Sequence, residues 1–276
     1  MSDIRQSEEY AKHLEGMGWT VERVGQVNYF IKKFPLVGSF MKIQRPRDIY
    51  PKTIEKLENN YRVFRTVIEP MTNSHAKILQ GRGYKLSKSP YLPTKTLEID
   101  LTLSRRKLFD NLKKDCKYAL RKTEKLPLFT QPVLKVFHAS YKKSVFPRRY
   151  VPSLNNLTSL KAEFLNSLFL ASHNGLSDNK LYHSGAIFLV SGTKAYYWQA
   201  FTNSEGRTSL SQYRLVWEGI LWAKSLKCSV FDFEGIYDSR FPNKSWHGFT
   251  HFKKSFGGQE VAYPGAFIKT SIPFLS

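Results

Sequence analysis

Cysteine is almost absent from this chain. Its 276 residues include only two cysteines, Cys116 and Cys228, whose spacing forms neither a disulfide framework nor a metal-binding motif. A fold stapled by disulfides and a metal centre built on thiolates are therefore excluded. We expect both cysteines to be reduced thiols in the core of a cytoplasmic protein.

Acidic residues are scarce as well. The chain has 43 Lys and Arg residues against 22 Asp and Glu residues, which gives a net charge of +21. Such an excess of positive charge favours a polyanionic partner, which can be RNA, a phosphorylated substrate or an anionic membrane surface.

Long hydrophobic runs are missing too. No apolar stretch approaches the ~20 residues that a membrane-spanning helix needs, and residues 1–9 are polar with charges of both signs, unlike a signal peptide. With 41% hydrophobic residues, the chain can still bury a substantial core. We expect a cytoplasmic protein that contacts the inner membrane face only peripherally.

Common catalytic motifs do not occur either. The sequence contains no P-loop, no GxSxG, no HExxH and no dinucleotide-binding fingerprint. Its seven histidines are scattered, and Gly248 between His247 and His251 argues against a helical metal pair. No metal site and no cofactor site is predicted.

What the chain does contain is a succession of strand and helix patterns. A mixed arrangement of short strands and helices over residues 1–93 precedes a larger one. The larger one predicts strands at 96–101, 184–190, 194–201 and 230–233 and helices at 104–124, 132–144, 157–170 and 212–227. The economical interpretation is two fused α/β units.

The predicted helix at 104–124 carries a basic face. Lys113, Lys117 and Arg121 recur at helical spacing, with Lys122 beside them. Like charges four residues apart destabilise a helix slightly. A face that binds a polyanion and an ordinary solvated face are therefore equally compatible with this pattern.

An aromatic, lysine-rich segment follows the strand at 230–233. Lys253 stands between Phe252 and Phe256, and two flanking rings would partly desolvate its ammonium group, which strengthens its field on a developing negative charge. The alternative is that Lys253 and the neighbouring Lys254 are solvated surface charges, because lysines are seldom buried.

Two carboxylates end that strand, and two arginines occupy an earlier loop. Asp232 and Glu234 share one strand face, where they serve either acid–base chemistry or a structural ion pair with Lys253 or Lys254. Arg148 and Arg149 lie between prolines, and their guanidinium groups suit phosphate oxygens. An unpaired surface loop is the alternative for the arginines.

The hairpin at 184–201 within an α/β unit suggests acyl transfer in the style of acetyltransferases. Enzymes of that style that use coenzyme A offer a glycine-rich pyrophosphate loop after the hairpin. Residues 202–209 contain one glycine and one basic residue, a poor phosphate cradle. An acyl donor other than acyl-CoA therefore deserves consideration.

An ordered set of short segments runs through nearly the whole chain. These are GW at 18–19, IEP at 68–70, KTLEIDL at 95–101, RKTEK at 121–125, FDFEGI at 231–236, GFTHFKKSFGG at 248–258 and YPG at 263–265. In this set the chain resembles the Fem aminoacyltransferases, which build the interpeptide bridge of bacterial peptidoglycan.

The resemblance implies a fold and a reaction. The fold is α/β (α+β), with two acetyltransferase-like domains built on mixed sheets. One domain comprises residues 1–95 plus 260–276, so that the C-terminal tail completes it, and the other comprises residues 96–259. The reaction moves an aminoacyl group from aminoacyl-tRNA to an amine on the stem peptide of a lipid-linked or nucleotide-linked peptidoglycan precursor. Neither a metal nor coenzyme A takes part, and a monomer is expected.

The resemblance also implies roles for particular residues. Phe252 and Lys253 match the pair at which the tRNA ester is attacked, and Lys253 would stabilise the oxyanion and the leaving ribose oxygen. Glu69 matches an acid that orients the incoming amine. Arg149, and less directly Arg148, would hold the diphosphate of the acceptor.

Further substrate contacts are expected around these residues. They come from Lys12, Phe64, Tyr150, Tyr197, Gln199 and Lys254. Gln199 replaces a tyrosine of the family, and Lys12 is nearest to a lysine that the family has near the end of its first helix, although Leu14 is an alternative match. For tRNA we expect contacts from Lys113, Lys117, Arg121 and Lys122, with strong salt dependence.

Two other functions stay open at this stage. The first is an N-acyltransferase of the same fold that uses acyl-CoA. The second is a basic protein that binds RNA or a membrane surface and has lost catalysis.

Overall fold

The computed structural model describes residues 2–145, 147, 150–173 and 181–271. The chain divides into two compact units. Unit 1 comprises Met1–Lys95, Tyr237–Lys244 and Val261–Ser276, and unit 2 comprises Thr96–Ile236 and Ser245–Glu260. The segment Tyr237–Lys244 thus belongs to unit 1, whereas the sequence-based division placed it in the second domain.

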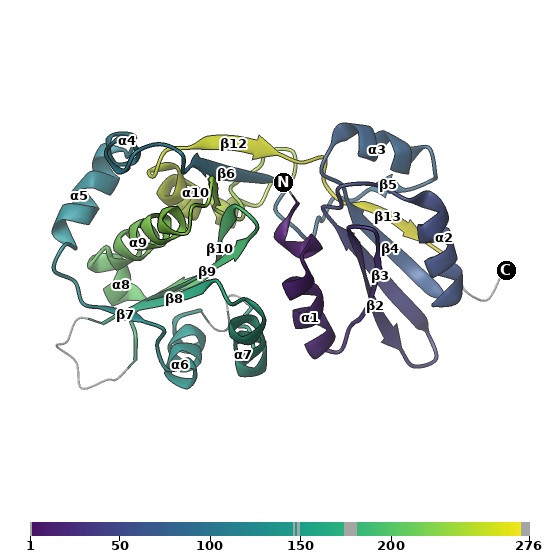
Figure 1. The fold of residues 1–276 in the computed structure, drawn as a ribbon, viewed down its shortest axis with the longest axis horizontal. Coiled ribbons are helices and arrows are strands. Elements are labelled where there is room, and N and C mark those ends of the chain that lie inside the picture. The colour runs from purple at the N-terminus through teal and green to yellow at the C-terminus, as the bar shows by residue number, and fades with distance from the viewer. Residues whose placement is uncertain (1, 146, 148–149, 174–180, 272–276) are drawn as a thin grey trace. The chain divides into compact units, whose positions relative to one another are not determined.

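Unit 1 is built on a six-stranded mixed sheet with the strand order β1-β2-β3-β4-β13-β5 (Figure 1). Its strands are β1 (Thr20–Val24), β2 (Val27–Phe34), β3 (Gly38–Gln44), β4 (Val63–Glu69), β5 (Lys85–Leu86) and β13 (Phe267–Thr270). Only β3 and β4 are parallel among the paired strands described. Strand β13 lies between β4 and β5, which confirms that the C-terminal tail completes the first sheet.

Apolar side chains alternate along the strands of this sheet, and helices cover the faces that these side chains form. The helices of unit 1 are the short η1 (Ile4–Gln6), α1 (Glu8–Gly16), α2 (Pro51–Asn60) and α3 (Asn73–Gln80). Met41 and Ile43 of β3 join the core beneath α2 and α3. Side chains alternate along a strand, so Lys42 and Gln44 point to the opposite face, toward η1 and α1.

Arg45 connects the end of β3 to the C-terminal tail within unit 1. Its guanidinium group donates hydrogen bonds to Asp3 Oδ2 at 3.2 Å and to the Pro93 carbonyl at 2.8 Å. The same group lies 3.7 Å from the centre of the Tyr263 ring. Arg45 is only 2% exposed, and these contacts offset the desolvation penalty of burying its charge.

Unit 2 contains a seven-stranded sheet with the order β12-β6-β11-β10-β9-β8-β7. Its strands are β6 (Lys95–Asp100), β7 (Leu128–Thr130), β8 (Ser167–Ser172), β9 (Ser184–Ser191), β10 (Lys194–Thr202), β11 (Val230–Asp232) and β12 (Gln259–Ala262). Strands β10 and β11 are parallel, and β9 and β10 form the predicted hairpin. The two mixed sheets confirm the predicted α/β class.

The helices of unit 2 surround this sheet. They are α4 (Arg105–Asp110), α5 (Lys114–Lys122), α6 (Leu134–Val145), α7 (Leu154–Glu163), α8 (Ser204–Thr208), α9 (Ser211–Ser225), the short η2 (Lys244–Trp246) and α10 (His247–Lys254). Helix α9 packs on β9, and its Leu215, Val216 and Ile220 belong to the unit 2 core, as do both cysteines, which are unpaired and buried.

Two sequence predictions about helices were wrong, and one helix was not predicted. The helix expected at 104–124 is broken into α4 and α5, because Lys113 N–H donates to the Ser255 carbonyl at 2.8 Å instead of continuing the helix. The helix expected at 157–170 ends at Glu163, and β8 follows it. Residues 247–254, which the sequence analysis assigned to no helix or strand, form α10, which is followed by Gly257 and Gly258 in left-handed conformations.

No helix among the described residues is both long and apolar enough to cross a bilayer.

Gly219 provides a test of packing in unit 2. A Cβ atom added there would lie 2.3 Å from Phe188 Cε1 in the core. We expect Gly219→Ala to lower the free energy of unfolding by about 1–3 kcal/mol through overpacking, despite the higher helix propensity of alanine. Chemical denaturation measures this difference.

Gly248→Ala in α10 is the matched control. Nothing lies within 4 Å of the added Cβ atom there, so this variant should be neutral or slightly more stable. Equal effects of the two variants would contradict the packing described for Gly219.

Candidate functional site

Lys253 is buried in the last turn of α10 in unit 2, with 9% of its surface exposed. Its ammonium group donates hydrogen bonds to the carbonyls of Phe233 at 2.7 Å and Gly235 at 2.6 Å. Between them, Glu234 adopts a φ of 54° and Gly235 a φ of 123°. This turn after β11 aims both carbonyls at the ammonium, so that the charge is held in one place.

The rings nearest to this ammonium are not the ones predicted. Its nitrogen lies 4.9 Å from the centre of the Phe249 ring and 5.7 Å from that of Tyr197. The predicted neighbours Phe252 and Phe256 pack on Tyr213 instead, at centroid distances of 4.8 and 5.8 Å. The reason is that 247–254 is helical, which separates the direction of Lys253 from those of residues 252 and 256.

A cavity of about 470 Å³ opens in unit 2 beside this lysine. Tyr197 and Phe249, the two rings that contact the ammonium, also line the cavity, together with Phe252. The remaining lining residues are Ser144, Val145, Ala200, Phe201, Thr202, Gly206, Arg207, Leu210, Gln212 and Tyr213. The cavity is thus largely aromatic and apolar, as a site for a small organic group is.

Polar groups at this cavity are positioned by the hairpin and α9. Gln212 Nε2 donates to the Tyr197 hydroxyl at 2.7 Å. Gln199, predicted to contact substrate, lies on β10 at a β-bulge, where the register shifts between Tyr197 and Gln199. The bulge follows Tyr197 directly. It therefore sets the direction of the side chains in the part of β10 that comes after Tyr197.

Residues 202–209 do not form a phosphate cradle in the structure. They contain α8, whose N-cap residue Asn203 accepts a hydrogen bond from Gly206 N–H at 2.9 Å through its own side chain. A Cβ atom at Gly206 would meet Ser184 Oγ at 2.3 Å. The glycine therefore allows close packing against Ser184. Its N–H group already donates to Asn203 and is not free to bind a phosphate.

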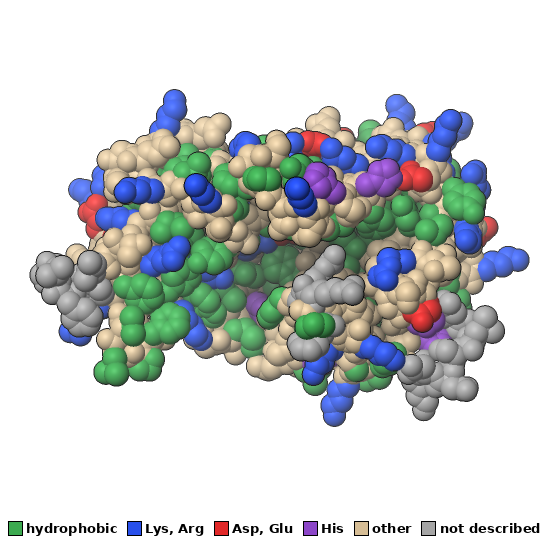
Figure 2. Space-filling view, turned by 180° about the vertical axis from the view of Figure 1, so that it is seen from behind, with side chains coloured by type: hydrophobic (Ala, Val, Ile, Leu, Met, Phe, Trp, Pro, Cys, Tyr) green, Lys and Arg blue, Asp and Glu red, His purple; other side chains and the backbone are tan. Residues whose placement is uncertain are grey.

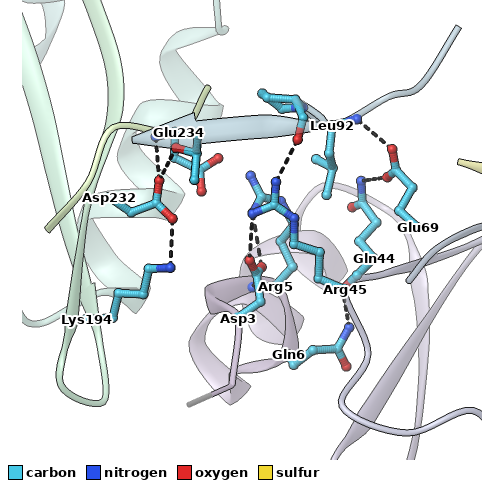
Figure 3. Close-up of polar contacts among 12 residues, drawn as sticks. Asp3, Arg5, Gln6, Gln44, Arg45, Glu69, Leu92, Lys194, Asp232 and Glu234 are labelled. Atoms are coloured by element: carbon cyan, nitrogen blue, oxygen red, sulfur yellow. Dashed lines mark hydrogen bonds and ion pairs between the residues drawn. The ribbon is translucent and has the colours of Figure 1, made fainter. Parts of the chain in front are cut away.

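The acids at the end of β11 have other partners than the sequence suggested. Asp232, fully buried, pairs with Lys194 at 2.7 Å and accepts from Thr96 Oγ1 at 2.5 Å (Figure 3). Lys254 pairs with Glu260. Asp232 is thus part of a structural ion pair with a lysine of β10, and the prediction that it faces Lys253 or Lys254 was wrong.

Glu69 ends β4 in unit 1 and is 4% exposed. Its carboxylate accepts hydrogen bonds from Gln44 Nε2 at 3.0 Å and from Leu92 N–H at 2.6 Å (Figure 3). The register of β3 and β4 pairs Gln44 with Glu69 and Lys42 with Val67. Glu69 and Lys42 therefore share the sheet face that turns away from α2 and α3.

Lys42 is a half-buried cation that the sequence did not single out. Its ammonium lies 4.5 Å from the centre of the Trp19 ring and 5.6 Å from that of Phe30. Burial, and then repulsion from Arg5, lower the pKa of Lys42 to about 8, while Glu69 opposes the shift. Among the described residues, Lys42 has no hydrogen bond and no ion pair.

A second lysine contacts Trp19, and a histidine lies within the electrostatic reach of Lys42. Lys32 Nζ donates to the Gly18 carbonyl at 2.7 Å and lies 5.8 Å from the centre of the Trp19 ring. Burial, with a contribution from Lys42, lowers the pKa of His13 to about 4, so this histidine is neutral at pH 7. We call Trp19, Lys32 and Lys42 the unit 1 cation cluster.

The signal for this cluster was present in the sequence. Lys42 stands between Met41 and Ile43 in a strand, so alternation places it on the face opposite the core. Only the tertiary structure shows that η1 and α1 lie over that face and leave the lysine half-buried. Lys12, expected to contact substrate, is exposed on α1.

Other predicted contacts lie elsewhere. Phe64 is the second residue of β4 and packs on Phe34 at a centroid distance of 6.1 Å, at the opposite end of the strand from Glu69. Tyr150 is 74% exposed. Arg148 and Arg149 lie outside the described residues.

The residues predicted to bind tRNA lie on or beside α5. Lys113 is its N-cap residue, Lys117 donates to the Asp110 carbonyl at 2.8 Å, and Arg121 and Lys122 are exposed in its last turn. On the face shown in Figure 2, Lys and Arg side chains are spread over the surface with few acidic ones between them. This distribution gives the surface a positive electrostatic field, but it does not single out one patch as a binding site for tRNA.

Comparison with solved structures shows the same fold in several proteins of low sequence identity. FemX superposes with a TM-score of 0.78 at 14% identity, covering 98% of this chain and 92% of FemX. The C-terminal domain of a putative lysylphosphatidylglycerol synthetase from Agrobacterium fabrum gives 0.65 at 10% identity, covering 97% and 89%. A tandem GNAT protein of clavulanic acid biosynthesis gives 0.56 at 8% identity, covering 90% and 81%.

These likenesses confirm the predicted acetyltransferase-like fold. A search of curated protein sequences finds no match. The model of the FemAB family, however, matches residues 134–275, just over half of the chain. The matched region includes the hairpin, the cavity and the whole of α10 with Lys253. The chain therefore belongs to the FemAB family and is a transferase of the Fem type.

Proposed function

We propose that this protein transfers an aminoacyl group from aminoacyl-tRNA to an amine on the stem peptide of a peptidoglycan precursor. One observation carries the proposal: in a chain of the FemAB family, a buried ammonium group is fixed beside an aromatic cavity by two backbone carbonyls. A fixed positive charge in a site shielded from water is what the collapse of an ester requires.

The chemistry follows from the charges that develop. The neutral acceptor amine attacks the ester carbonyl carbon, a carbon–nitrogen bond forms, and the carbonyl oxygen becomes negative. The carbon–oxygen bond to the ribose then breaks, and the ribose oxygen takes up the proton that the nitrogen loses. Lys253 stabilises both negative oxygens electrostatically, while the cavity lined by Tyr197 and Phe249 excludes water from the ester.

The donor is assigned to tRNA on the basis of charge. The chain has a net charge of +21, and exposed basic residues follow α5. Phosphate contacts of this kind release counterions, so binding weakens steeply with salt. Acyl-CoA is less suitable as donor, since the Gly206 N–H group that a pyrophosphate would need is already bonded to Asn203.

The acceptor is assigned to the unit 1 cation cluster. A partly desolvated ammonium without an ion pair is costly, and Lys42, which is half-buried, has two aromatic rings beside it and no ion pair among the described residues. A phosphate or carboxylate of the acceptor would supply the missing partner, with Lys32 as a second cation. Glu69 on the same sheet face would orient the amine.

Replacing Lys253 tests the proposed mechanism. We expect Lys253→Met to lower the rate of transfer by at least ~10²-fold, the effect of removing one oxyanion-stabilising group, while affinity for charged tRNA changes little. Rates come from single-turnover assays, and affinity from filter binding. Lys227→Met, which replaces an exposed lysine of unit 2, is the matched control and should retain wild-type rates. Unaltered turnover in Lys253→Met would remove the assigned role.

The shifted pKa of Lys42 predicts a dependence of stability on pH. In the folded chain this pKa is about 8, against 10.5 when exposed. Above pH 8 the unfolded chain therefore binds more protons than the folded chain, and stability contributed by this residue rises with pH. We expect Lys42→Met to be more stable than wild type at pH 7, by up to about 3 kcal/mol, and this advantage to shrink as the pH rises from 8 toward 10.

Urea unfolding at a series of pH values measures this difference, and the same variant should bind the acceptor more weakly. Lys52→Met, at an exposed position of α2, is the control and should show no such trend. A constant difference between Lys42→Met and wild type across pH 7–10 would show that Lys42 carries its charge at no cost.

The class of reaction is tested by incubation with a pool of charged tRNAs and candidate muropeptides, followed by mass spectrometry. The expected result is a muropeptide heavier by one amino-acid residue, only with intact aminoacyl-tRNA. A mass gain that requires acyl-CoA instead would replace the proposal with the coenzyme A alternative.

A further inference from the structure

The turn between β2 and β3 lies at one end of the unit 1 sheet (Figure 1). Its apolar side chains are exposed to solvent. Leu36 is 97% exposed, Val37 54% and Phe34 45%. Single exposed apolar residues are common on protein surfaces, but three within four consecutive positions at the apex of a hairpin form a projecting patch. We call these three residues the hairpin tip.

Leu36 is conformationally expensive at this position. Its φ is 66°, in the left-handed region that favours glycine or asparagine. Its side chain also gains almost nothing from packing, because nearly all of it is in water. Leu36 therefore destabilises the folded unit both through its backbone conformation and through its exposed apolar side chain. Such an outlier at a surface points to a role outside folding.

Cations lie directly behind the hairpin tip. Lys33 is exposed and its ammonium lies 5.2 Å from the centre of the Tyr61 ring. Arg62 is exposed, and its carbonyl accepts from Ser39 N–H at 3.0 Å, which places it next to the base of the turn. The acid beside them, Glu22, accepts a hydrogen bond from the Tyr61 hydroxyl.

The shape and size of this patch decide between two kinds of partner. A stable protein interface buries about 800 Å² and 20–30 residues on each side, far more than three side chains at the apex of a turn provide. A bilayer surface needs only a few apolar side chains below the headgroups and basic residues at their level. The hairpin tip with Lys33 and Arg62 has this composition.

We propose that the β2–β3 turn inserts into the headgroup region of a bilayer that contains anionic lipids, with Leu36 deepest and Lys33 and Arg62 at the phosphates. The three apolar side chains supply insertion, and the two cations supply the preference for negative charge. This proposal does not rest on the transfer reaction, and either can fail without the other.

The test is sedimentation of the full-length protein with vesicles of phosphatidylcholine alone or mixed with phosphatidylglycerol. Leu36→Asn should weaken binding to the mixed vesicles at least ~10-fold, by analogy with the loss of an apolar anchor, while the melting temperature stays equal or rises because asparagine tolerates φ above zero. Loss of binding without loss of stability separates a surface role from a folding defect.

Matched controls use residues of the same type elsewhere. Leu165 is 93% exposed in unit 2, and Leu165→Asn should leave vesicle binding unchanged. Lys33→Gln and Arg62→Gln should each weaken binding about fivefold on anionic vesicles only. Lys52→Gln, at the end of α2 farthest from Arg62, should have a smaller effect than either.

Three outcomes overturn the proposal. The first is wild-type protein that does not sediment with mixed vesicles. The second is Leu36→Asn protein that sediments as wild type does. The third is concentration-dependent self-association that Leu36→Asn abolishes while vesicle binding persists, which would assign the hairpin tip to a second copy of the chain.

Discussion

The bonds between the Lys253 ammonium and the carbonyls of Phe233 and Gly235 are the constraint on which unit 2 depends. A charge at 9% exposure is tolerated only when its hydrogen-bonding capacity is used. Here two carbonyls at the end of β11 are turned toward it by the left-handed conformation of Glu234 and by Gly235. The same bonds tie α10 to the end of β11 and thereby position one wall of the aromatic cavity. The bonds that stabilise the local fold thus also shape the site.

Three lysines of this chain, the buried Lys194 and Lys253 and the half-buried Lys42, are held in three different ways. Lys194 has the carboxylates of Asp232 and Glu98 at 2.7 and 2.5 Å, and its charge is neutralised within the fold. Lys253 is held by two backbone carbonyls. Lys42 lies beside two aromatic rings, and its pKa falls to about 8. A lysine that two carboxylates neutralise has a structural role, whereas a partly desolvated lysine with a lowered pKa is a candidate for binding a substrate anion.

Strand patterns were predictable because they report burial directly. The hairpin of β9 and β10 and the alternation in β3 follow from side chains that point alternately to two faces. The helix at 104–124 failed because its break depends on a hydrogen bond from Lys113 to Ser255, 142 positions later in the chain, and no local pattern encodes such a contact. Residues 167–172, SLFLAS, suit a buried helix or a strand equally, and only pairing with β9 decides between them.

The same distinction separates the parts of the site that the sequence indicated from those that it did not. Lys253 was identifiable from its motif, but its aromatic neighbours were not, because they depend on 247–254 being helical. Lys42 had no motif at all. Salt screens the exposed cations on and around α5 but has a much smaller effect on the buried Lys253. The net charge of +21 therefore describes two populations: exposed groups that govern encounter with a polyanion, and buried groups whose fields act on whatever is bound beside them.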